Sequence, residues 1–310
     1  MEENSDGVEN SILASAEAGR SPKVSIILPT YNGALHLRES IESCLQQTYT
    51  NIELVIVDDG STDGTSEIVR SFRDERIKYI RHKRNRRLPR ALNTGLSAST
   101  GAYLTWTSDD NQYFPRAIEE MVGVLERNHH VDLVCADVWM INWETGQKKL
   151  FTRPDNIDLR FKNAVGSCFL FTRKAFQETG FYDPKYELVE DYEYWIRLCS
   201  RFKSLRYPYP LYMYGDHPNS LTRTKGASIF LLSSILKYQY NYITFRDLGK
   251  SLIDYFACLI GSQDPGRINV GVALLRDNLK VIRISFLLGL LYSSLIFFCV
   301  PLKFARRILA

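Results

Sequence analysis

The sequence lacks the short motifs that identify several common kinds of site. Its six cysteines are scattered and include no CxxC pair, so the sequence indicates neither a zinc site nor a disulfide framework. A GxGxxG fingerprint and a GxxxxGKS/T loop are both missing, which argues against a dinucleotide-dependent dehydrogenase and against a P-loop enzyme. We therefore expect reduced, buried thiols in a cytosolic domain.

Residues 1–23 also lack the basic start and the apolar core of a secretory signal peptide. This stretch is polar and without periodicity, and residues 1–19 carry acids but no bases. Segments of this composition bury too little apolar surface to fold. We expect residues 1–22 to form a disordered lead.

Basic charge gathers at two places in a chain of 310 residues whose net charge is only +4. Six lysines and arginines fall within residues 81–90, and the last eight residues are also basic. This distribution favours local contact with an anion or a membrane. Aromatic residues do not alternate with the basic ones in residues 81–90, so we expect no nucleic-acid partner. A solvated loop is the other interpretation of this run.

Apolar runs alternate with helical patterns over the first third of the chain. The run at residues 52–57 is typical of a parallel strand in a sheet that helices cover on both faces. Strand and helix alternating at this interval predicts a doubly wound α/β domain with a mainly parallel sheet, which we place at residues 23–225. The predicted strands are residues 24–28, 52–57, 77–80 and 103–106, and the predicted helices include residues 65–72 and 88–97.

Polar residues follow three of these strands at the point where each strand ends. They occupy residues 29–33, 58–64 and 108–111. Ligands of doubly wound sheets bind at the carboxyl ends of the strands, so these segments should line one crevice. Carboxylates such as Asp109 and Asp110 are costly to desolvate after a buried strand unless turn donors, a helix start or a metal satisfies them. This stretch alone leaves a capped turn and a metal site open.

Five motifs occur in the order in which glycosyltransferase family 2 carries them. They are VSIILPTYN at 24–32, VDDGSTDG at 57–64, NTG at 93–95, SDD at 108–110 and ED at 190–191. The chain therefore resembles this family over residues 24–224, roughly two thirds of its length. The resemblance implies the GT-A fold and a nucleotide-sugar donor, with a UDP-sugar as the first expectation.

The resemblance assigns donor binding to the first half of the chain. Asp59 would accept a hydrogen bond from uracil N3, and residues 29–31 would lie against the base and the ribose. An Asx turn followed by a helix cap is the other interpretation of residues 58–64. The donor-binding residues implied by the resemblance are Pro29, Thr30, Tyr31, Asn32, Asp59, Asn93, Ser108 and Asp109.

Asp110 corresponds to the metal-holding aspartate of the family's Asp-x-Asp motif. Mn²⁺ or Mg²⁺ would bridge this carboxylate and the donor diphosphate. The six basic residues within 81–90 would lie around this diphosphate or around an acidic acceptor, with a solvated loop as the other interpretation. Ser108 stands where the motif has its first aspartate and contributes no charge, so a non-catalytic nucleotide-sugar-binding protein is the alternative function. His217 lies in a segment similar to the family's closing loop and is a second metal candidate, with an ordinary loop histidine as the alternative.

Glu190 and Asp191 lie in the acceptor half of the family pattern. Inverting transfer needs a carboxylate to take the proton of the acceptor hydroxyl, and the resemblance implies Asp191 for this role, with Glu190 as second choice. Both acids could instead cap the helix that follows them. The Gln-x-x-Arg-Trp motif of processive members is missing. We expect a non-processive inverting transferase that uses a saccharide or lipid-linked acceptor.

Residues 226–310 lie beyond the resemblance and are predicted to form a helical extension. Residues 284–302 are 19 uncharged residues between Arg283 and Lys303, a length that just reaches a transmembrane helix. A single span would carry the basic end across the bilayer against the positive-inside tendency. We therefore favour a re-entrant or interfacial helix at the cytosolic membrane face, with a buried helix as the alternative.

Overall fold

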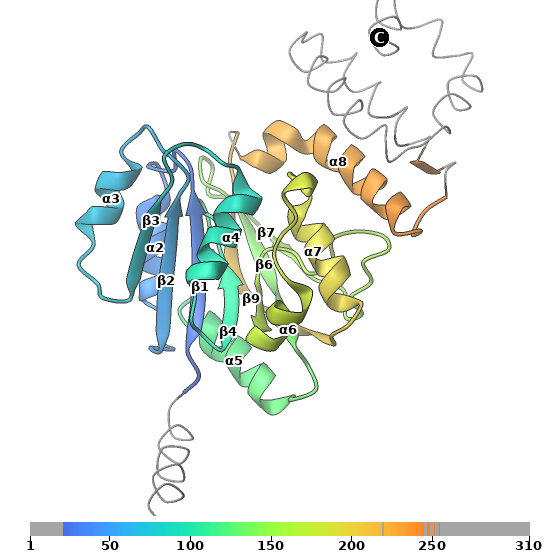
Figure 1. Cartoon of the computed structure of the whole chain (residues 1–310), viewed down its shortest axis with the longest axis horizontal. Coiled ribbons are helices and arrows are strands. Elements are labelled where there is room, and N and C mark those ends of the chain that lie inside the picture. The colour runs from blue at the N-terminus through green and yellow to red at the C-terminus, as the bar shows by residue number, and fades with distance from the viewer. Residues whose placement is uncertain (1–20, 219, 245–246, 249–250, 252–253, 255–310) are drawn as a thin grey trace, which may run out of the picture. The chain divides into compact units, whose positions relative to one another are not determined.

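The computed structural model of this protein describes residues 21–218, 220–244, 247–248, 251 and 254 (Figure 1). Nearly all of the predicted lead and the whole of residues 284–302 lie outside the described residues. The chain divides into two compact units. The first contains residues 1–157, 164–184 and 197–216, and the second contains residues 158–163, 185–196 and 217–310.

The first unit contains the predicted parallel strands. They lie in the order β3-β2-β1-β4, and every neighbouring pair among them is parallel. Their carboxyl ends therefore meet at one edge of the sheet (Figure 1). The strands are β1 (Val24–Thr30), β2 (Ile52–Asp58), β3 (Ile77–Arg81) and β4 (Tyr103–Trp106).

The sheet continues beyond β4 in a mixed half with the order β4-β8-β6-β9-β5, and β7 pairs with β6. β6 and β9 are parallel, whereas the β4–β8, β6–β8, β5–β9 and β6–β7 pairs are antiparallel. Pairing of β5 with β9 brings residues 212–213 beside residues 112–113. These strands are β5 (Gln112–Tyr113), β6 (Leu133–Asn142), β7 (Lys148–Phe151), β8 (Phe169–Thr172) and β9 (Ser204–Asp216).

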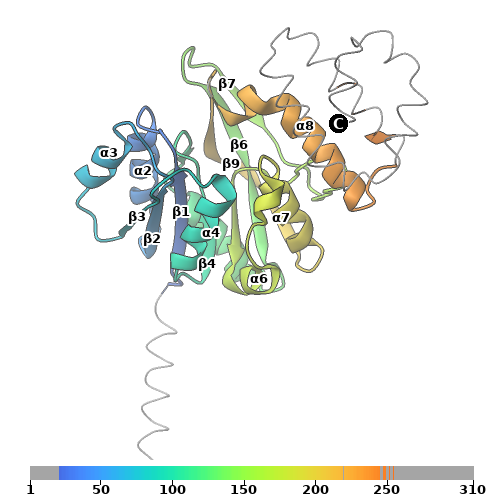
Figure 2. The ribbon, with the colours of Figure 1, turned by 45° about the horizontal axis from the view of Figure 1, so that its top comes forward.

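Helices cover both faces of the parallel half, as the apolar runs predict. Leu54 and Ile56 of β2 pack in the same cluster as Leu37 of α2, whereas Val55 and Val57 pack with Ala91 of α4 on the other face. α4 lies against β1 in both views (Figure 1, Figure 2). The helices of this unit are α2 (Leu37–Leu45), α3 (Thr65–Ser71), α4 (Leu88–Ala98), α5 (Ala117–Arg127) and α6 (Arg173–Thr179).

The second unit contains α8 (Leu221–Gln239) and the first turns of α7 (Glu190–Cys199). Tyr192 of α7 donates a hydrogen bond to the carbonyl of Leu159, which ties residues 158–163 to this helix. The predicted domain boundary at residues 225–226 falls inside α8. Within the described part of the chain, no helix has the length and hydropathy of a membrane span.

The cysteines of the described residues are free thiols, as expected from their spacing. Cys44, Cys135 and Cys168 are buried, and Cys199 is half-buried. Burial raises the pKa of the Cys44 thiol to about 12. These thiols therefore behave as core side chains.

Gly95 of α4 faces β1 too closely for a side chain, which gives a test of the packing. A Cβ atom there would lie 2.4 Å from Cγ2 of Ile27, so we expect Gly95→Ala to lower the free energy of unfolding by about 1–3 kcal/mol. At Gly123 of α5 the nearest atom is a flexible guanidinium nitrogen of Arg127 at 2.9 Å. Gly123→Ala should be neutral or stabilising by up to about 1 kcal/mol. Equal denaturant midpoints for the two variants would contradict this packing.

Candidate functional site

The loop that follows β1 is tied to the loop that follows β2. The backbone N–H of Asn32 donates to Ser61 Oγ at 2.9 Å, and Asn32 Oδ1 accepts from the Thr62 N–H at 2.8 Å. The Ala34 N–H donates to Asp63 Oδ2 at 3.1 Å. Asn32 has a φ of 55°, a value that asparagine adopts more readily than most residues. Residues 29–33 and 58–64 therefore lie together, as predicted for a common crevice.

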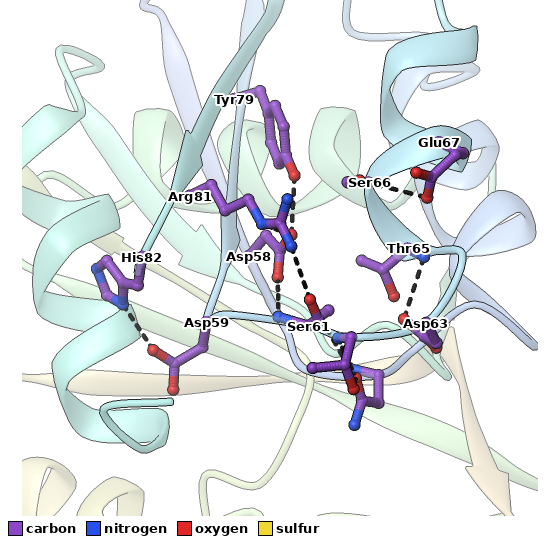
Figure 3. Close-up of polar contacts among 12 residues, drawn as sticks. Asp58, Asp59, Ser61, Asp63, Thr65, Ser66, Glu67, Tyr79, Arg81 and His82 are labelled. Carbon is purple, nitrogen blue, oxygen red and sulfur yellow. Dashed lines mark hydrogen bonds and ion pairs between the residues drawn. The ribbon is translucent and has the colours of Figure 1, made fainter. Parts of the chain in front are cut away.

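Asp58 is fully buried and closes the turn after β2 (Figure 3). Its carboxylate accepts hydrogen bonds from the Ser61 N–H and the Tyr79 hydroxyl, both at 2.8 Å. Arg81 Nε lies 3.2 Å from Asp58 Oδ2. Burial, followed by the hydrogen bond to Asp58, raises the pKa of Tyr79 to about 12, so the phenol remains a donor. Asp58 is thus a structural acid.

Asp59 is 3% exposed and anchors the loop that follows β3. Both of its carboxylate oxygens lie 2.9 Å from the Arg86 backbone nitrogen, which donates to them. His82 Nδ1 lies 2.6 Å from Asp59 Oδ1 (Figure 3). The predicted uracil acceptor is therefore already bonded to protein groups, and its contact with a base remains a prediction.

Asp109 is bonded to the loop that follows β1. Thr30 Oγ1 donates to Asp109 Oδ2 at 2.5 Å. A Cβ atom on Gly33 would lie 2.1 Å from the same oxygen, so this close approach requires glycine. Burial, followed by the charge of Asp110, raises the pKa of Asp109 to about 6. Negative charge is thus crowded at the end of β4, immediately beside Thr30.

The turn that carries Asp110 is held by three further hydrogen bonds. Ser40 Oγ donates to the Ser108 carbonyl at 2.9 Å, and the Gly215 N–H donates to Asn111 Oδ1 at 2.8 Å. Trp143 Nε1 donates to the backbone carbonyl of Asp110 at 3.3 Å. The sequence gives no signal that Trp143 lies at this turn, because the pairing of β6, β9 and β5 brings it here.

The residues at this turn fit a divalent cation whose remaining ligands come from the donor phosphates and water. The described residues contain no group of three or more His, Cys, Asp and Glu side chains that could enclose a metal. Mg²⁺ and Mn²⁺ commonly take one or two carboxylates, and substrate phosphates and waters supply the rest. Burial is the larger cause of the raised pKa of Asp109 and the charge of Asp110 the smaller, and a cation at Asp110 would offset the second cause.

The other predicted donor-binding residues have different surroundings. Asn93 Nδ2 donates to the Tyr182 carbonyl at 2.8 Å, and its Oδ1 accepts from the Tyr182 N–H at 2.9 Å. An asparagine amide has two donors and two lone pairs, so one of each remains for a ligand. Pro29 is buried, Ser108 is half-buried, and Tyr31 is 47% exposed.

Glu190, Asp191 and His217 belong to the second unit. Asp191 Oδ2 accepts from Asn163 Nδ2 and its Oδ1 from the Tyr192 N–H, both at 2.7 Å. The carbonyl of His217 accepts from the Ser220 N–H at 3.0 Å, in the turn before α8. Sequence reasoning missed Asn163, for which the sequence carries no signal.

Glu190 is 4% exposed, and its Oε2 has no hydrogen-bond partner among the described residues. Burial, followed by the charge of Asp191, raises the pKa of Glu190 to about 8. This shift favours the protonated form of Glu190, whereas a base must be ionised.

A family model described as glycosyl transferase family 2 matches residues 25–223. The chain belongs to this family. The resemblance stated from the motifs is thereby confirmed. An uncharacterized glycosyltransferase of Rickettsia felis is 35% identical over 189 residues, which are 57% of this chain and 31% of that protein. The putative glycosyltransferase EpsE of Bacillus subtilis is 45% identical over 116 residues, which are 36% and 42% of the two chains.

The chain spans only part of the first three curated relatives, which are Rickettsia proteins: 31% of the length of one and 58% of the other two. Among solved structures, S. aureus TarS 1-349 in complex with UDP-GlcNAc has a TM-score of 0.60 at 15% identity, over 84% of this chain and 81% of that chain. The mannosyltransferase PcManGT from Pyrobaculum calidifontis, in complex with GDP-Man and Mn2+, has a TM-score of 0.54 at 16% identity, over 93% and 94%. These similarities confirm the predicted GT-A fold.

The raised pKa of Glu190 predicts a pH-dependent stability. Between the unfolded pKa of 4.5 and the folded pKa of about 8, the folded state binds more protons, so stability falls as pH rises through this window. Glu190→Gln removes this loss. Relative to the wild type, the variant should gain unfolding free energy as pH rises from 4.5 to 9, by about 1.4 kcal/mol for each unit by which the pKa of Glu190 is raised.

Urea unfolding at a series of pH values measures this difference. Glu178→Gln, at an exposed position of α6, is the matched control and should show no such gain. Parallel pH profiles for Glu190→Gln and the wild type would contradict a buried, protonated Glu190.

Proposed function

We propose that this protein is a non-processive inverting glycosyltransferase that moves a sugar from a nucleotide-diphosphate donor, first of all a UDP-sugar, to a saccharide or lipid-linked acceptor. The observation that carries the proposal is the turn of Asp109 and Asp110, fixed beside the loop after β1 at the carboxyl edge of a family 2 fold. TarS, a structural neighbour, was solved with UDP and with UDP-GlcNAc, which supports this donor class.

The donor would lie along the carboxyl edge of the parallel strands. Residues 29–32 and Asp59 would face the nucleoside, because Asn32 holds their two loops together. Asp110 would hold the metal ion. A bound Mn²⁺ or Mg²⁺ would neutralise negative charge on the leaving diphosphate. Thr30 orients Asp109, so that Asp110 keeps its place beside it.

In this proposal Asp191 takes the proton of the acceptor hydroxyl as the hydroxyl attacks the anomeric carbon from the face opposite the diphosphate. Asn163 Nδ2 and the Tyr192 N–H each donate to one oxygen of Asp191, which fixes the orientation of this carboxylate. Glu190 keeps its own proton in the neighbouring buried position. Membrane association through residues 284–302, at the cytosolic face, remains part of the proposal.

A non-catalytic nucleotide-sugar-binding protein is the second candidate function. Ser108, which replaces an acid of the family motif, favours it, because the metal then has one carboxylate fewer. Such a protein would bind UDP without turning over any UDP-sugar. Release of UDP from a panel of UDP-sugars in the presence of Mn²⁺ distinguishes the two functions.

The role of Asp110 is tested by its amide variant. Asp110→Asn keeps the shape of the side chain but removes the charge that a cation requires, so UDP affinity in Mn²⁺ should fall at least about ten-fold. UDP binding measured by calorimetry with and without Mn²⁺ shows whether the loss is confined to the metal-dependent part. Glu144→Gln, at an exposed position next to Trp143, is the control and should bind as the wild type does. Unchanged Mn²⁺-dependent affinity in Asp110→Asn would remove Asp110 from the metal site.

The role of Asp191 is tested by turnover at constant donor affinity. Asp191→Asn cannot take a proton, so UDP release from the donor that the wild type uses should fall by about 10² to 10⁴. UDP affinity should stay within about two-fold of the wild type, because Asp191 acts on the acceptor. A variant that keeps more than about a tenth of the turnover would show that Asp191 is only a helix cap.

A further inference from the structure

Four arginines line a hollow on the loop that follows β3. The hollow has a volume of about 490 Å³. All four arginines are exposed, and in the described part of the chain Arg84, Arg86 and Arg90 form no ion pair with a carboxylate. Concentrated positive charge without a protein counter-charge attracts anions from solution. The lining residues are Arg84, Asn85, Arg86, Arg87 and Arg90.

Hydrogen bonds from its N–H groups fix the backbone of this loop, and the arginine side chains are exposed. Asp59 accepts the Arg86 N–H, and Asn85 Oδ1 accepts the Arg87 N–H at 2.9 Å. Gly60 has a φ of 81°, and a Cβ atom there would lie 2.6 Å from the Arg84 carbonyl carbon. The loop therefore packs directly on the turn after β2. A fixed loop pays little ordering entropy when a ligand binds.

The chemistry of the hollow fits a phosphate group. A guanidinium presents several N–H donors in a planar fork that matches two phosphate oxygens. A phosphate monoester carries a charge of about −1.5 to −2 at neutral pH, more than a carboxylate offers to several arginines. The lining contains no aromatic side chain that could stack on a base.

The strand order separates this hollow from the proposed place of the donor diphosphate, and this step rests on the proposed function. The arginine loop follows β3, whereas Asp110 follows β4, and β2 and β1 lie between them. Neighbouring strands are about 4.8 Å apart, so the two strand ends are separated by roughly 14 Å. Asp59, after β2, stands between them. A donor with its diphosphate on Asp110 leaves the hollow open to another anion.

We propose that the hollow is a second phosphate-binding site that takes a phosphate group of a molecule other than the nucleotide-sugar donor. The phosphate could belong to a soluble phosphorylated compound or to the headgroup of an anionic lipid. Both sources present the same chemistry to the arginines, and the experiment distinguishes them.

The test compares the full-length wild type with Arg84→Gln/Arg86→Gln/Arg90→Gln, which leaves Arg87 and its backbone in place. Arg70→Gln/Arg73→Gln/Arg127→Gln is the control, because it removes the same charge from other exposed positions of the first unit. Inorganic pyrophosphate in EDTA is the soluble probe, since without a cation the acids at β4 repel it. Calorimetry should show a loss of affinity of at least about ten-fold for the hollow variant and less than about two-fold for the control.

Vesicle binding identifies the source of the phosphate. Preferential wild-type binding to phosphatidylcholine vesicles that contain phosphatidylglycerol, lost in the hollow variant but not in the control, supports a lipid headgroup. Pyrophosphate binding that depends on the hollow, with vesicle binding equal in wild type and variant, supports a soluble compound.

Two results would overturn the proposal. Equal pyrophosphate affinity in the wild type, the hollow variant and the control would show an ordinary solvated loop. Loss of Mn²⁺-dependent UDP binding in the hollow variant would assign the arginines to the donor site. If the wild type binds pyrophosphate through the hollow but binds no UDP with Mn²⁺, the proposed function fails while the phosphate site stands.

Discussion

The burial of two adjacent carboxylates at the end of β2 is the constraint on which this edge of the sheet depends. Asp58 is fully buried and Asp59 is 3% exposed, and a buried charge without partners costs several kcal/mol. β3 and the residue after it supply those partners, because Tyr79 and Arg81 bond to Asp58 and His82 bonds to Asp59. The loop that follows β3 also donates its Arg86 N–H to Asp59, so the position of this loop is linked to the burial of the two acids after β2.

The two ends of this edge carry opposite charge as a consequence. Asp59 accepts its hydrogen bond from a backbone N–H of the loop after β3, that of Arg86. The arginine side chains of this loop are exposed. After β4, burial and the charge of Asp110 both disfavour the ionised form of Asp109. In the proposed function a diphosphate would need a cation at the β4 end, whereas in the proposed second site a phosphate at the β3 end would meet guanidinium groups directly.

The parallel half of the sheet could be predicted because β1 and β2 are apolar on both faces and the helices have a local apolar period. The mixed half could not, since β5 has only two residues and pairs Gln112 with Met213. No local period reports a pairing between segments so far apart in the chain. The hydrogen bond from Trp143 to the Asp110 carbonyl depends on that pairing, so the sequence alone does not indicate it. The family and the GT-A fold were predicted correctly, because the order of the motifs along the chain identifies them without any knowledge of strand pairing.

A motif gives the type and order of site residues but not the hydrogen bonds that each makes. Asp191 illustrates this, because its partner Asn163 lies in a segment without any motif. Each oxygen of Asp191 accepts a hydrogen bond from an N–H donor, and these bonds hold the carboxylate in one orientation. Glu190 is buried and its Oε2 has no hydrogen-bond partner among the described residues, and burial favours its protonated form. In the proposed reaction the environment, and not the motif, therefore makes one acid the proton acceptor and leaves its neighbour protonated.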